Sequence, residues 1–339
     1  METLTLLCVN TGSTSVRIRA FSGTDFERAP AAAHFSGAND LTAALDSIDL
    51  IPRAVVHRIV TGFSGEDAEQ LSPPVRSRIE HHAPMAPLHV ARALEALDRC
   101  TARWPKAVQI AAYDSAYFKD LPARAVTFAV PRAWRERFGI RKIGYHGFSH
   151  EYIARRAPQL LDKSVERLIS VHLGGGASAS AILRGCAVET TMGFTPLEGL
   201  IMETRVGSLD PGVVLHLIRR CGVDAAEVEH QLSNASGMVA LAGTADMLAV
   251  EARRKDDPGA ALAFELYCYA VSRAIAALAV PLHGIDVVAF TGAIGFGSAA
   301  VRETVTRDLT WLGSLAVLAI EPEEELMMAR AAASLVPTP

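Results

Sequence analysis

Short apolar runs, separated by turn residues and by helical patterns, recur along the whole chain. The first run, residues 4–9, leads into the polar segment 10–15 and then into residues 16–21, where Arg17 and Arg19 alternate with apolar positions. This pattern predicts a hairpin whose second strand keeps one solvated face. Further buried strands are expected at 54–60, 107–113, 168–173, 178–183 and 286–290.

Helical periodicity lies between these strands, for example at 90–97, 152–161 and 260–280. Another helix is expected to begin after Asp210 as its cap, with Pro211 in its first turn, and to end before Gly222. Strands that alternate with helices predict an α/β fold. A shift of 163 positions brings Gly12 onto Gly175 within a second strand–loop–strand unit, which suggests duplicated domains facing each other.

Length, charge and cysteine use narrow the class of protein. At 339 residues two domains are expected. Because 33 basic residues nearly balance 37 acidic ones, no nucleic-acid or acidic-membrane partner is predicted. The longest apolar runs, 274–282 and 312–320, are shorter than a membrane span, and the acidic N-terminus does not resemble a secretory signal. The scattered cysteines are interpreted as reduced core thiols of a cytoplasmic protein: Cys8, Cys100, Cys186, Cys221 and Cys268.

Three loops rich in glycine, serine or threonine follow buried strands, at residues 10–15, 174–178 and 291–298. Backbone N–H groups in such loops can converge on a phosphate, and small side chains allow its close approach. Each loop alone is more simply an ordinary turn, but three in one chain favour a phosphate ligand. No Walker-type loop or protein-kinase signature accompanies them.

Five ionisable residues occupy apolar or glycine-flanked positions: Arg58, His89, Asp114, His146 and Arg205. Each alone is better explained as a buried ion pair or a core histidine. Together they supply two guanidinium groups, two imidazoles and a carboxylate at strand ends or tight turns, where α/β sites gather.

Two possible metal sites follow from spacing. His146 and His150 are four residues apart, as zinc ligands can be, but no Glu lies between them and Gly147 indicates a turn. Residues 323–325 are three glutamates that either begin a helix or ligate Mg²⁺.

The ordered motifs of the chain resemble those of the acetate kinase family, over nearly its whole length. The resemblance is carried by Asn10-Thr11-Gly12-Ser13-Thr14-Ser15, His57-Arg58-Ile59-Val60, Ala86-Pro87-Leu88-His89, Tyr113-Asp114-Ser115-Ala116, Gly144-Tyr145-His146-Gly147, His172-Leu173-Gly174-Gly175-Gly176, Met192-Gly193-Phe194-Thr195-Pro196-Leu197-Glu198-Gly199, Thr204-Arg205, Asp210-Pro211, Thr291-Gly292-Ala293-Ile294-Gly295 and Glu324-Glu325.

This resemblance implies an α/β protein of two actin-like (ribonuclease H-like) domains duplicated around a central cleft. Residues 1–116 with 326–339 would form the acyl-acceptor domain, and residues 117–325 the phosphoryl-donor domain. The implied reaction is direct in-line phosphoryl transfer between ATP and a short-chain carboxylate, acetate or propionate, with Mg²⁺, or Mn²⁺ as the alternative metal. A cytoplasmic homodimer is implied as well.

The same resemblance assigns roles to individual residues. Asn10 and Glu324 would serve the metal, and Arg58, Asp114, His146 and Arg205 the phosphoryl transfer. Substrate would be bound by Arg58, Val60, Leu88, His89, Tyr145, Pro196 and Arg205. The nucleotide or its phosphates would be bound by Ser15, Arg17, His172, Gly174, Gly175, Gly176, Asp246, Gly292, Ala293, Ile294, Gly295, Phe296 and Gly297.

Departures from the family pattern concentrate on the implied nucleotide side. Gly175 stands where Asn is usual, Glu203 where Gly is usual and Leu248 where Arg is usual, while Phe296 and Gly297 replace a Glu-Asn pair. The chain is also shorter than a typical member. These changes suggest altered donor use, with pyrophosphate or another nucleotide in place of ATP. Another acid or sugar kinase of this fold and a non-catalytic phosphate-binding homologue remain as alternatives.

Overall fold

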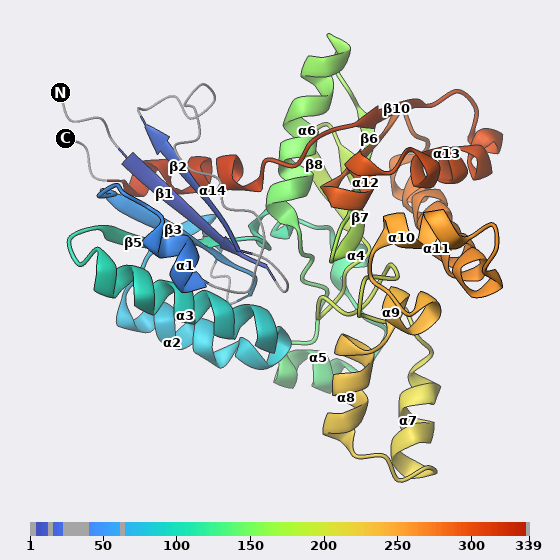
Figure 1. Cartoon of the computed structure of the whole chain (residues 1–339), viewed down its shortest axis with the longest axis horizontal. Helices are drawn as coiled ribbons and strands as arrows, with labels where there is room; N and C mark the ends of the chain where they lie inside the picture. Colours follow the sequence, from blue (N-terminus) through green and yellow to red (C-terminus); the bar gives the residue numbers. More distant parts are fainter. Residues whose placement is uncertain (1–4, 13–15, 23–40, 62–64, 337–339) are drawn as a thin grey trace. The chain divides into compact units, whose positions relative to one another are not determined.

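The computed structural model describes residues 5–12, 16–22, 41–61 and 65–336 (Figure 1). The chain forms two compact units. Unit 1 comprises Met1–Lys119, Gly147–Tyr152 and Glu323–Pro339, and unit 2 comprises Asp120–His146 and Ile153–Pro322. Helix α6 (Gly147–Leu161) begins in unit 1 and continues into unit 2.

Unit 1 is built on a five-stranded sheet with the order β2-β1-β3-β5-β4. The strands β1, β3 and β5 are parallel, whereas β2 and β4 run antiparallel to their neighbours. The strand bounds are Thr5–Thr11 for β1, Val16–Ser22 for β2, Ala54–Ile59 for β3, Ala68–Gln70 for β4 and Val108–Tyr113 for β5. Its helices are α1 (Leu41–Asp46), α2 (Pro73–His81), α3 (Pro87–Arg103) and α14 (Glu324–Ala332).

Helices cover both faces of this sheet, because both sets of alternating side chains on its parallel strands are apolar. Leu6 and Cys8 on β1 face one core with Met328 of α14. The intervening Leu7 and Val9 face the opposite core, which α1 and α3 complete. The parity of a residue along β1, β3 or β5 therefore decides which helical layer its side chain meets.

Unit 2 repeats a five-stranded sheet, with the order β10-β9-β6-β7-β8. Its strands are β6 (Arg167–Leu173), β7 (Ala177–Leu183), β8 (Cys186–Thr190), β9 (Val287–Thr291) and β10 (Ala316–Ala319). The hairpin β6–β7 corresponds to β1–β2, and the parallel neighbour β9 to β3. The predicted duplication of a strand–loop–strand unit is thus a duplication of sheets.

The helices of unit 2 include one unusually long apolar segment, α11 (Pro258–Leu282). Within the described ranges it is the one helix long and apolar enough to cross a membrane. It confirms the helix predicted at 260–280, of which the apolar run 274–282 is only the last part. Half of its most apolar stretch is buried, and it packs on the sheet strands and neighbouring helices of unit 2. The other helices are α4 (Ala123–Val126), α5 (Arg132–Phe138), α7 (Pro211–Arg219), α8 (Ala225–Asn234), α9 (Gly237–Ala242), α10 (Met247–Arg253), α12 (Gly292–Gly297) and α13 (Ala299–Asp308).

Several local predictions are confirmed. The strands expected at 54–60, 107–113, 168–173, 178–183 and 286–290 are present within one or two residues. Asp210 caps α7 by accepting a hydrogen bond from the Gly212 N–H at 2.8 Å, and the helix ends before Gly222.

Three local predictions are wrong. The arginine face of β2 is not solvated: the side chains of Arg17 and Arg19 are only 25% and 22% exposed and form ion pairs with Glu324 and Glu323. Residues 291–298 do not form an open loop, because α12 begins directly after β9. Cys186 and Cys221 are exposed, so the thiols are not all in the core.

Stability should depend on pH through His57, which points from β3 into the α3 side of the sheet. Its Nε2 lies 2.8 Å from Gln109 Oε1, and burial lowers the pKa of His57 from 6.5 to about 4. Since the unfolded chain binds this proton more tightly, the free energy of unfolding should fall as pH drops from 6.5 towards 4, by about 3 kcal/mol in all. Urea unfolding at a series of pH values measures this slope.

The matched variant is His57→Asn, which keeps an amide near Gln109 and removes the titration. Its free energy of unfolding should vary less between pH 6.5 and 4 than that of the parent. An unchanged slope in His57→Asn would show that His57 is not the responsible group.

Candidate active site

Three polar side chains end three adjacent parallel strands of unit 1. Asn10 follows Cys8 on β1, Arg58 follows Val56 on β3, and Asp114 follows Ala112 after β5. Each is two residues beyond a side chain of the α14-facing core, so all three point to the same face. The sheet order β1-β3-β5 places them side by side. Strand parity and topology therefore gather them at the carboxyl edge of the sheet, where α/β sites form.

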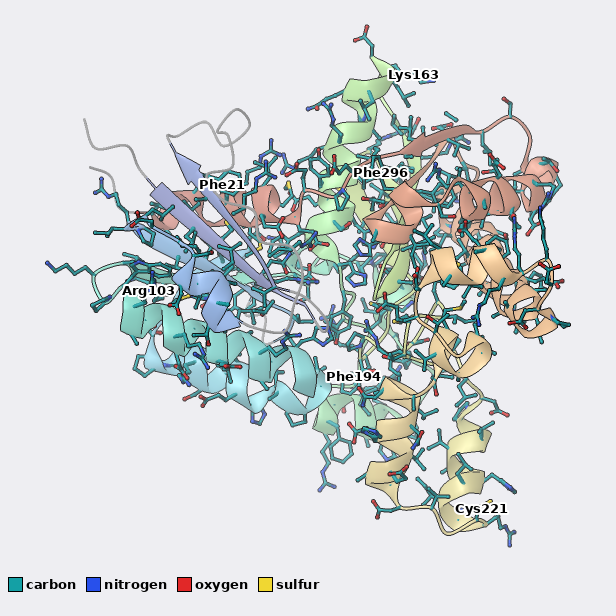
Figure 2. The ribbon with its side chains drawn as sticks, in the orientation of Figure 1. Phe21, Arg103, Lys163, Phe194, Cys221 and Phe296 are labelled. Carbon is teal, nitrogen blue, oxygen red and sulfur yellow. The ribbon has the colours of Figure 1, made fainter. Side chains whose placement is uncertain are left out.

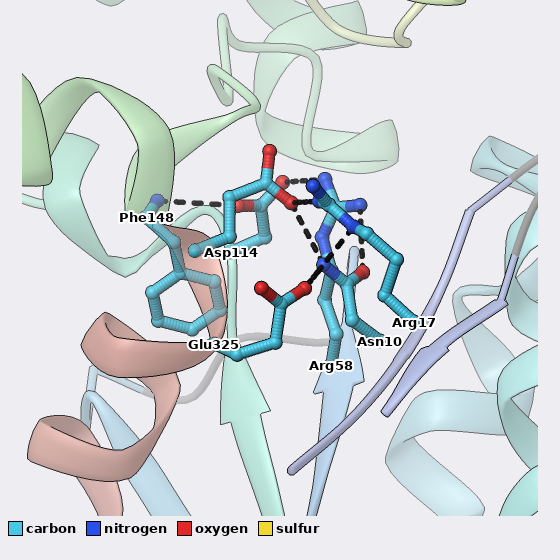
Figure 3. Close-up of polar contacts among 7 residues, drawn as sticks. Asn10, Arg17, Arg58, Asp114, Phe148 and Glu325 are labelled. Carbon is cyan, nitrogen blue, oxygen red and sulfur yellow. Dashed lines mark hydrogen bonds and ion pairs between the residues drawn. The ribbon is translucent and has the colours of Figure 1, made fainter. Parts of the chain in front are cut away.

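These side chains make a continuous buried network (Figure 3). Arg58 Nη2 donates to Asp114 Oδ2 at 2.7 Å, and Arg58 Nη1 donates to Asn10 Oδ1 at 3.3 Å. Asp114 Oδ1 in turn accepts from the Phe148 N–H at 3.3 Å. Asn10, Arg58 and Asp114 are 2%, 7% and 1% exposed.

The glutamates at the start of α14 complete the network. Asn10 Nδ2 donates to Glu324 Oε2 at 2.8 Å and to Glu325 Oε1 at 2.7 Å. Arg17, which pairs directly with Asn10 across the β1–β2 register, forms ion pairs with both glutamates. Three carboxylates (Asp114, Glu324 and Glu325) thus face two guanidinium groups, and the buried group has a formal charge of −1.

The carboxylates hold the two arginines in their charged form. Burial by itself would lower the pKa of Arg58, but Asp114 and then Glu324 raise it above its ordinary value. The pKa of Arg17 is raised mainly by Glu324. Both guanidinium groups are therefore permanent cations within this network.

The two carboxylates of Glu324 and Glu325 and the surplus negative charge are of the kind that Mg²⁺ selects in proteins. Asn10 presents its Nδ2 to Glu324 and Glu325, while its Oδ1 accepts from Arg58. Asn10 and Glu324, the predicted metal residues, are in direct contact, and Glu325 joins them. Glu325 was missed as an individual site residue, although it lies in the acidic triplet 323–325. Arg17 was predicted to bind nucleotide phosphate, and the structure places its guanidinium against these glutamates.

In unit 2 a second group of site residues surrounds the glycine loop after β6. His146 has a left-handed backbone with φ 59°, and its Nδ1 lies 2.9 Å from Ser178 Oγ. Its ring stacks on His172, with centroids 4.4 Å apart. A hydrogen bond and a stacking contact thereby fix the imidazole from two sides. Because His146 precedes α6 in this conformation, it does not share a regular helical face with His150.

Arg205 is held on the other side of the same loop. Its Nη1 donates to the Pro196 carbonyl at 2.7 Å, and the side chain is buried. The neighbouring Phe194 carbonyl accepts from the Tyr145 hydroxyl at 2.8 Å. One stretch of backbone, residues 194–196, therefore positions both Tyr145 and Arg205.

The side chains of His146 and Arg205 both approach the position of Gly176. A Cβ built on Gly176 would lie 2.8 Å from Arg205 Nη2 and 2.8 Å from His146 Nε2. The glycine leaves this space free of any side chain. A guanidinium group and an imidazole thus face one small volume beside the backbone of the loop.

The two predicted donor segments are neighbours in unit 2. The Gly174 N–H donates to the Gly176 carbonyl at 2.9 Å, and the Ala293 nitrogen lies 3.7 Å from where a Gly174 Cβ would be. Gly292 has φ 81°, and a Cβ there would approach the Leu173 carbonyl to 2.4 Å, so only glycine fits. The turn of α12 that follows includes Ile294, Gly295 and Gly297.

The departures from the family pattern lie around these segments. Phe296, labelled in Figure 2, lies on α12. It is 43% exposed, and Leu248 on α10 is 66% exposed. Asp246 caps α10 by accepting from the Leu248 N–H at 2.9 Å. The Glu203 N–H contacts the Gly175 carbonyl at 3.4 Å, and burial raises the pKa of Glu203, with Arg205 opposing that shift.

The remaining predicted substrate residues are divided between the units. Val60 is 3% exposed just after β3, and Leu88 and His89 lie in the first turn of α3, all in unit 1. Tyr145 and Pro196 are buried in unit 2. Ser15 lies outside the described residues.

Removing one partner of the buried Arg58–Asp114 pair should be costly. Asp114→Asn leaves Arg58 without its closest counter-charge, and breaking such a buried pair costs about 3–5 kcal/mol. Chemical denaturation measures the loss. The matched control is Asp98→Asn, which breaks the exposed pair with Arg76 and should cost about 1 kcal/mol or less. If both variants lost the same free energy of unfolding, the buried pair would contribute no more to the stability of unit 1 than the exposed pair does.

Comparison with known sequences agrees with the motifs. The model of the Acetokinase family matches residues 31–338. An acetate kinase of Carboxydothermus hydrogenoformans is 37% identical over 267 residues, which are 77% of this chain and 67% of the relative. An acetate kinase of Acaryochloris marina is 39% identical over 76% of this chain and 65% of its own. The chain spans about two thirds of the length of these curated relatives.

Solved structures extend the likeness to the whole fold. A propionate kinase of Francisella tularensis superposes with a TM-score of 0.86 at 25% identity, covering 96% of this chain and 98% of the other. An acetate kinase of Porphyromonas gingivalis gives a TM-score of 0.85 at 26% identity, with 98% and 100% coverage. With its two duplicated α/β units, the chain belongs to the acetokinase family of kinases whose phosphoryl acceptor is a carboxylate.

Proposed function

We propose that this protein transfers a phosphoryl group between ATP and a short-chain carboxylate, acetate or propionate, in the presence of Mg²⁺. Unit 1 would hold the acyl acceptor and unit 2 the phosphoryl donor. The product in the forward direction is an acyl phosphate, formed when a carboxylate oxygen bonds to the γ-phosphorus and the bond to ADP breaks. The protein would act as a homodimer in the cytoplasm, on small molecules alone.

The observation that carries this proposal is the convergence of Arg205 and His146 at Gly176. Both reactants are anions, and a carboxylate needs no general base to attack phosphorus. Catalysis of this transfer therefore rests on charge neutralisation and alignment. Arg205 is a permanent cation, and His146 Nε2 lies beside the same glycine, Gly176. Together these two groups would neutralise and align the transferring phosphoryl group.

The network of unit 1 offers the complementary groups for the acceptor. Arg58 Nε is buried without a hydrogen-bond partner among the described residues, which fits a binding site for an anionic oxygen. Asp114 keeps the guanidinium in place. Asn10 and Glu324 would hold Mg²⁺, which supplies Lewis-acid neutralisation of the phosphate charge when bound. Val60, which is 3% exposed just after β3, would be an apolar neighbour for the acyl methyl group within unit 1.

The donor phosphates would lie against the backbone of residues 174–176 and 292–293. The names of the relatives as acetate and propionate kinases do not favour the alternatives of another donor or of a non-catalytic homologue. The exposed Leu248 and Phe296 nevertheless make donor choice a property to measure.

The direct test is detection of acyl phosphate as its hydroxamate, with acetate, propionate and butyrate as acceptors and ATP, GTP and pyrophosphate as donors. Product from acetate or propionate with ATP and Mg²⁺ supports the proposal. Product with pyrophosphate alone would overturn the assignment of ATP, and no product with any donor would overturn the enzymatic function. Arg205→Lys serves as the inactive control, because Lys cannot bind both Pro196 and a phosphoryl group as a guanidinium does.

Gly176→Ala probes the shared volume without removing any functional group. The new methyl would displace Arg205 Nη2 and His146 Nε2, which are side-chain ends, so the fold should persist. Displacing one well-placed donor in such a site costs about 10²–10³ in rate, and kcat for acyl phosphate formation should fall by at least about 10²-fold.

Gly174→Ala is the comparison variant, since its methyl would make only contacts of 3.6 Å or more. Because the donor phosphates would lie against residues 174–176, its KM for ATP should rise, but its kcat should fall less than that of Gly176→Ala. The role given to Arg205 and His146 would be untenable if Gly176→Ala kept its kcat, or if both alanine variants lost the same activity.

A further inference from the structure

The loop 191–199, whose carbonyl groups hold side chains of the site, closes on itself at two points. A Cβ on Gly199, where φ is 111°, would lie 2.8 Å from the Thr191 carbonyl oxygen, so the two ends of the loop are in close backbone contact. One residue earlier the Glu198 side chain folds back over Gly193, because a Cβ on Gly193 would overlap Glu198 Oε2. The Glu198 carboxylate therefore fills the space that a side chain on Gly193 would need.

Between these two points the loop carries three carbonyl groups that accept hydrogen bonds from the site. The Gly193 carbonyl accepts from the Ile143 N–H at 2.9 Å, three residues before His146. Two further carbonyls of the loop accept from the Tyr145 hydroxyl at 2.8 Å and from Arg205 Nη1 at 2.7 Å. A displacement of the loop would therefore move Arg205 together with the segment that leads to His146.

A lysine ammonium group connects the start of this loop with the Glu198 carboxylate. Lys142 Nζ donates to the Thr190 carbonyl at 2.8 Å and to Glu189 Oε1 at 2.7 Å, and its side chain is 16% exposed. Glu198 is half-buried, and burial raises its pKa. The Lys142 charge opposes that shift, whereas Glu189 adds to it. Lys142 is thus the cation that stabilises the ionised form of Glu198 over Gly193.

We propose that Glu198 is a positioning residue for the phosphoryl transfer. Its carboxylate, packed over Gly193 and attracted by Lys142, keeps the loop in the conformation in which the Pro196 carbonyl orients Arg205. Glu198 acts through Arg205 and does not touch the reactants. The inference rests on the proposed function, because Arg205 is assigned there to the transferring phosphoryl group.

Two single variants open this contact from opposite sides. Glu198→Ala removes the carboxylate, and Gly193→Ala displaces it, since the new methyl would occupy the position of Oε2. Each should misplace Arg205 and lower kcat for acyl phosphate formation by about 10-fold to 10²-fold. The KM for ATP should stay nearly unchanged, which is the pattern of an interaction that matters in the transition state and not in donor binding.

The double variant Gly193→Ala/Glu198→Ala tests whether the two residues act as one contact. The methyl of Gly193→Ala overlaps the carboxylate, whereas its next neighbour, Phe128 Cζ, would lie 3.3 Å away. Without the carboxylate the methyl fits, so kcat of the double variant should be no lower than that of Glu198→Ala alone. Independent losses would multiply instead.

Two further variants separate shape, charge and general effects. Glu198→Gln keeps the shape of the side chain and loses only its attraction to Lys142, so it should retain more of the parental kcat than Glu198→Ala. Glu166→Ala is the matched control, because Glu166 is another glutamate of unit 2 that pairs with Arg184 at the surface. Its kcat should equal that of the parent.

The inference would be overturned by multiplied losses in the double variant, by a parental kcat in Glu198→Ala, or by a raised KM for ATP at unchanged kcat. Urea unfolding shows whether each variant is folded. If Glu198→Ala is not, Glu198→Asp replaces it, because its shorter side chain withdraws the carboxylate from Gly193. An inactive parent would overturn the proposed function and this inference with it, whereas an active parent with indifferent variants would overturn the inference alone.

Discussion

The ion pair between Arg58 and Asp114 is the contact on which the rest of unit 1 depends. Both side chains are almost fully buried, and a charge in that position is tolerated only when it is paired and hydrogen-bonded. Asp114 also accepts from the Phe148 N–H, which fixes the start of α6. A Cβ on Gly147 would lie 2.0 Å from the Asp114 carbonyl, so the close approach of α6 to this strand end requires glycine. Charge pairing and backbone packing are therefore satisfied by the same few residues.

Much of this arrangement could be predicted from the sequence, because local patterns carry it. The apolar runs identified β1, β3 and β5, and strand parity puts Asn10, Arg58 and Asp114 on one face once the runs are adjacent. Asp210 and Pro211 gave the start of α7 for the same reason, since a cap is a local interaction. The motifs that resemble those of acetate kinases lie at strand ends and in turns, whose conformation is determined by neighbouring residues.

What could not be predicted depends on partners far away in the chain. Arg17 and Arg19 alternate with apolar residues, which is the pattern of a solvated strand face. Their counter-charges lie more than 300 residues later, at the start of α14, and no sequence pattern near β2 predicts these ion pairs. The short strands β4, β8 and β10 were not predicted for a related reason. Strands of three to five residues at or near a sheet edge have little periodicity of their own.

Duplication of the sheet also explains how one fold can present two kinds of anion site. At its strand ends unit 1 carries charged and amide side chains, Asn10 and Arg58, held by buried counter-charges. The corresponding ends of β6 and β9 in unit 2 lead instead into Gly174 and Gly292, two buried glycines that bring residues 174–176 close to the start of α12. Under the proposed function this difference is what the reaction needs. A small carboxylate is recognised by a fixed guanidinium, whereas a chain of phosphates is better served by backbone N–H groups that no side chain obstructs.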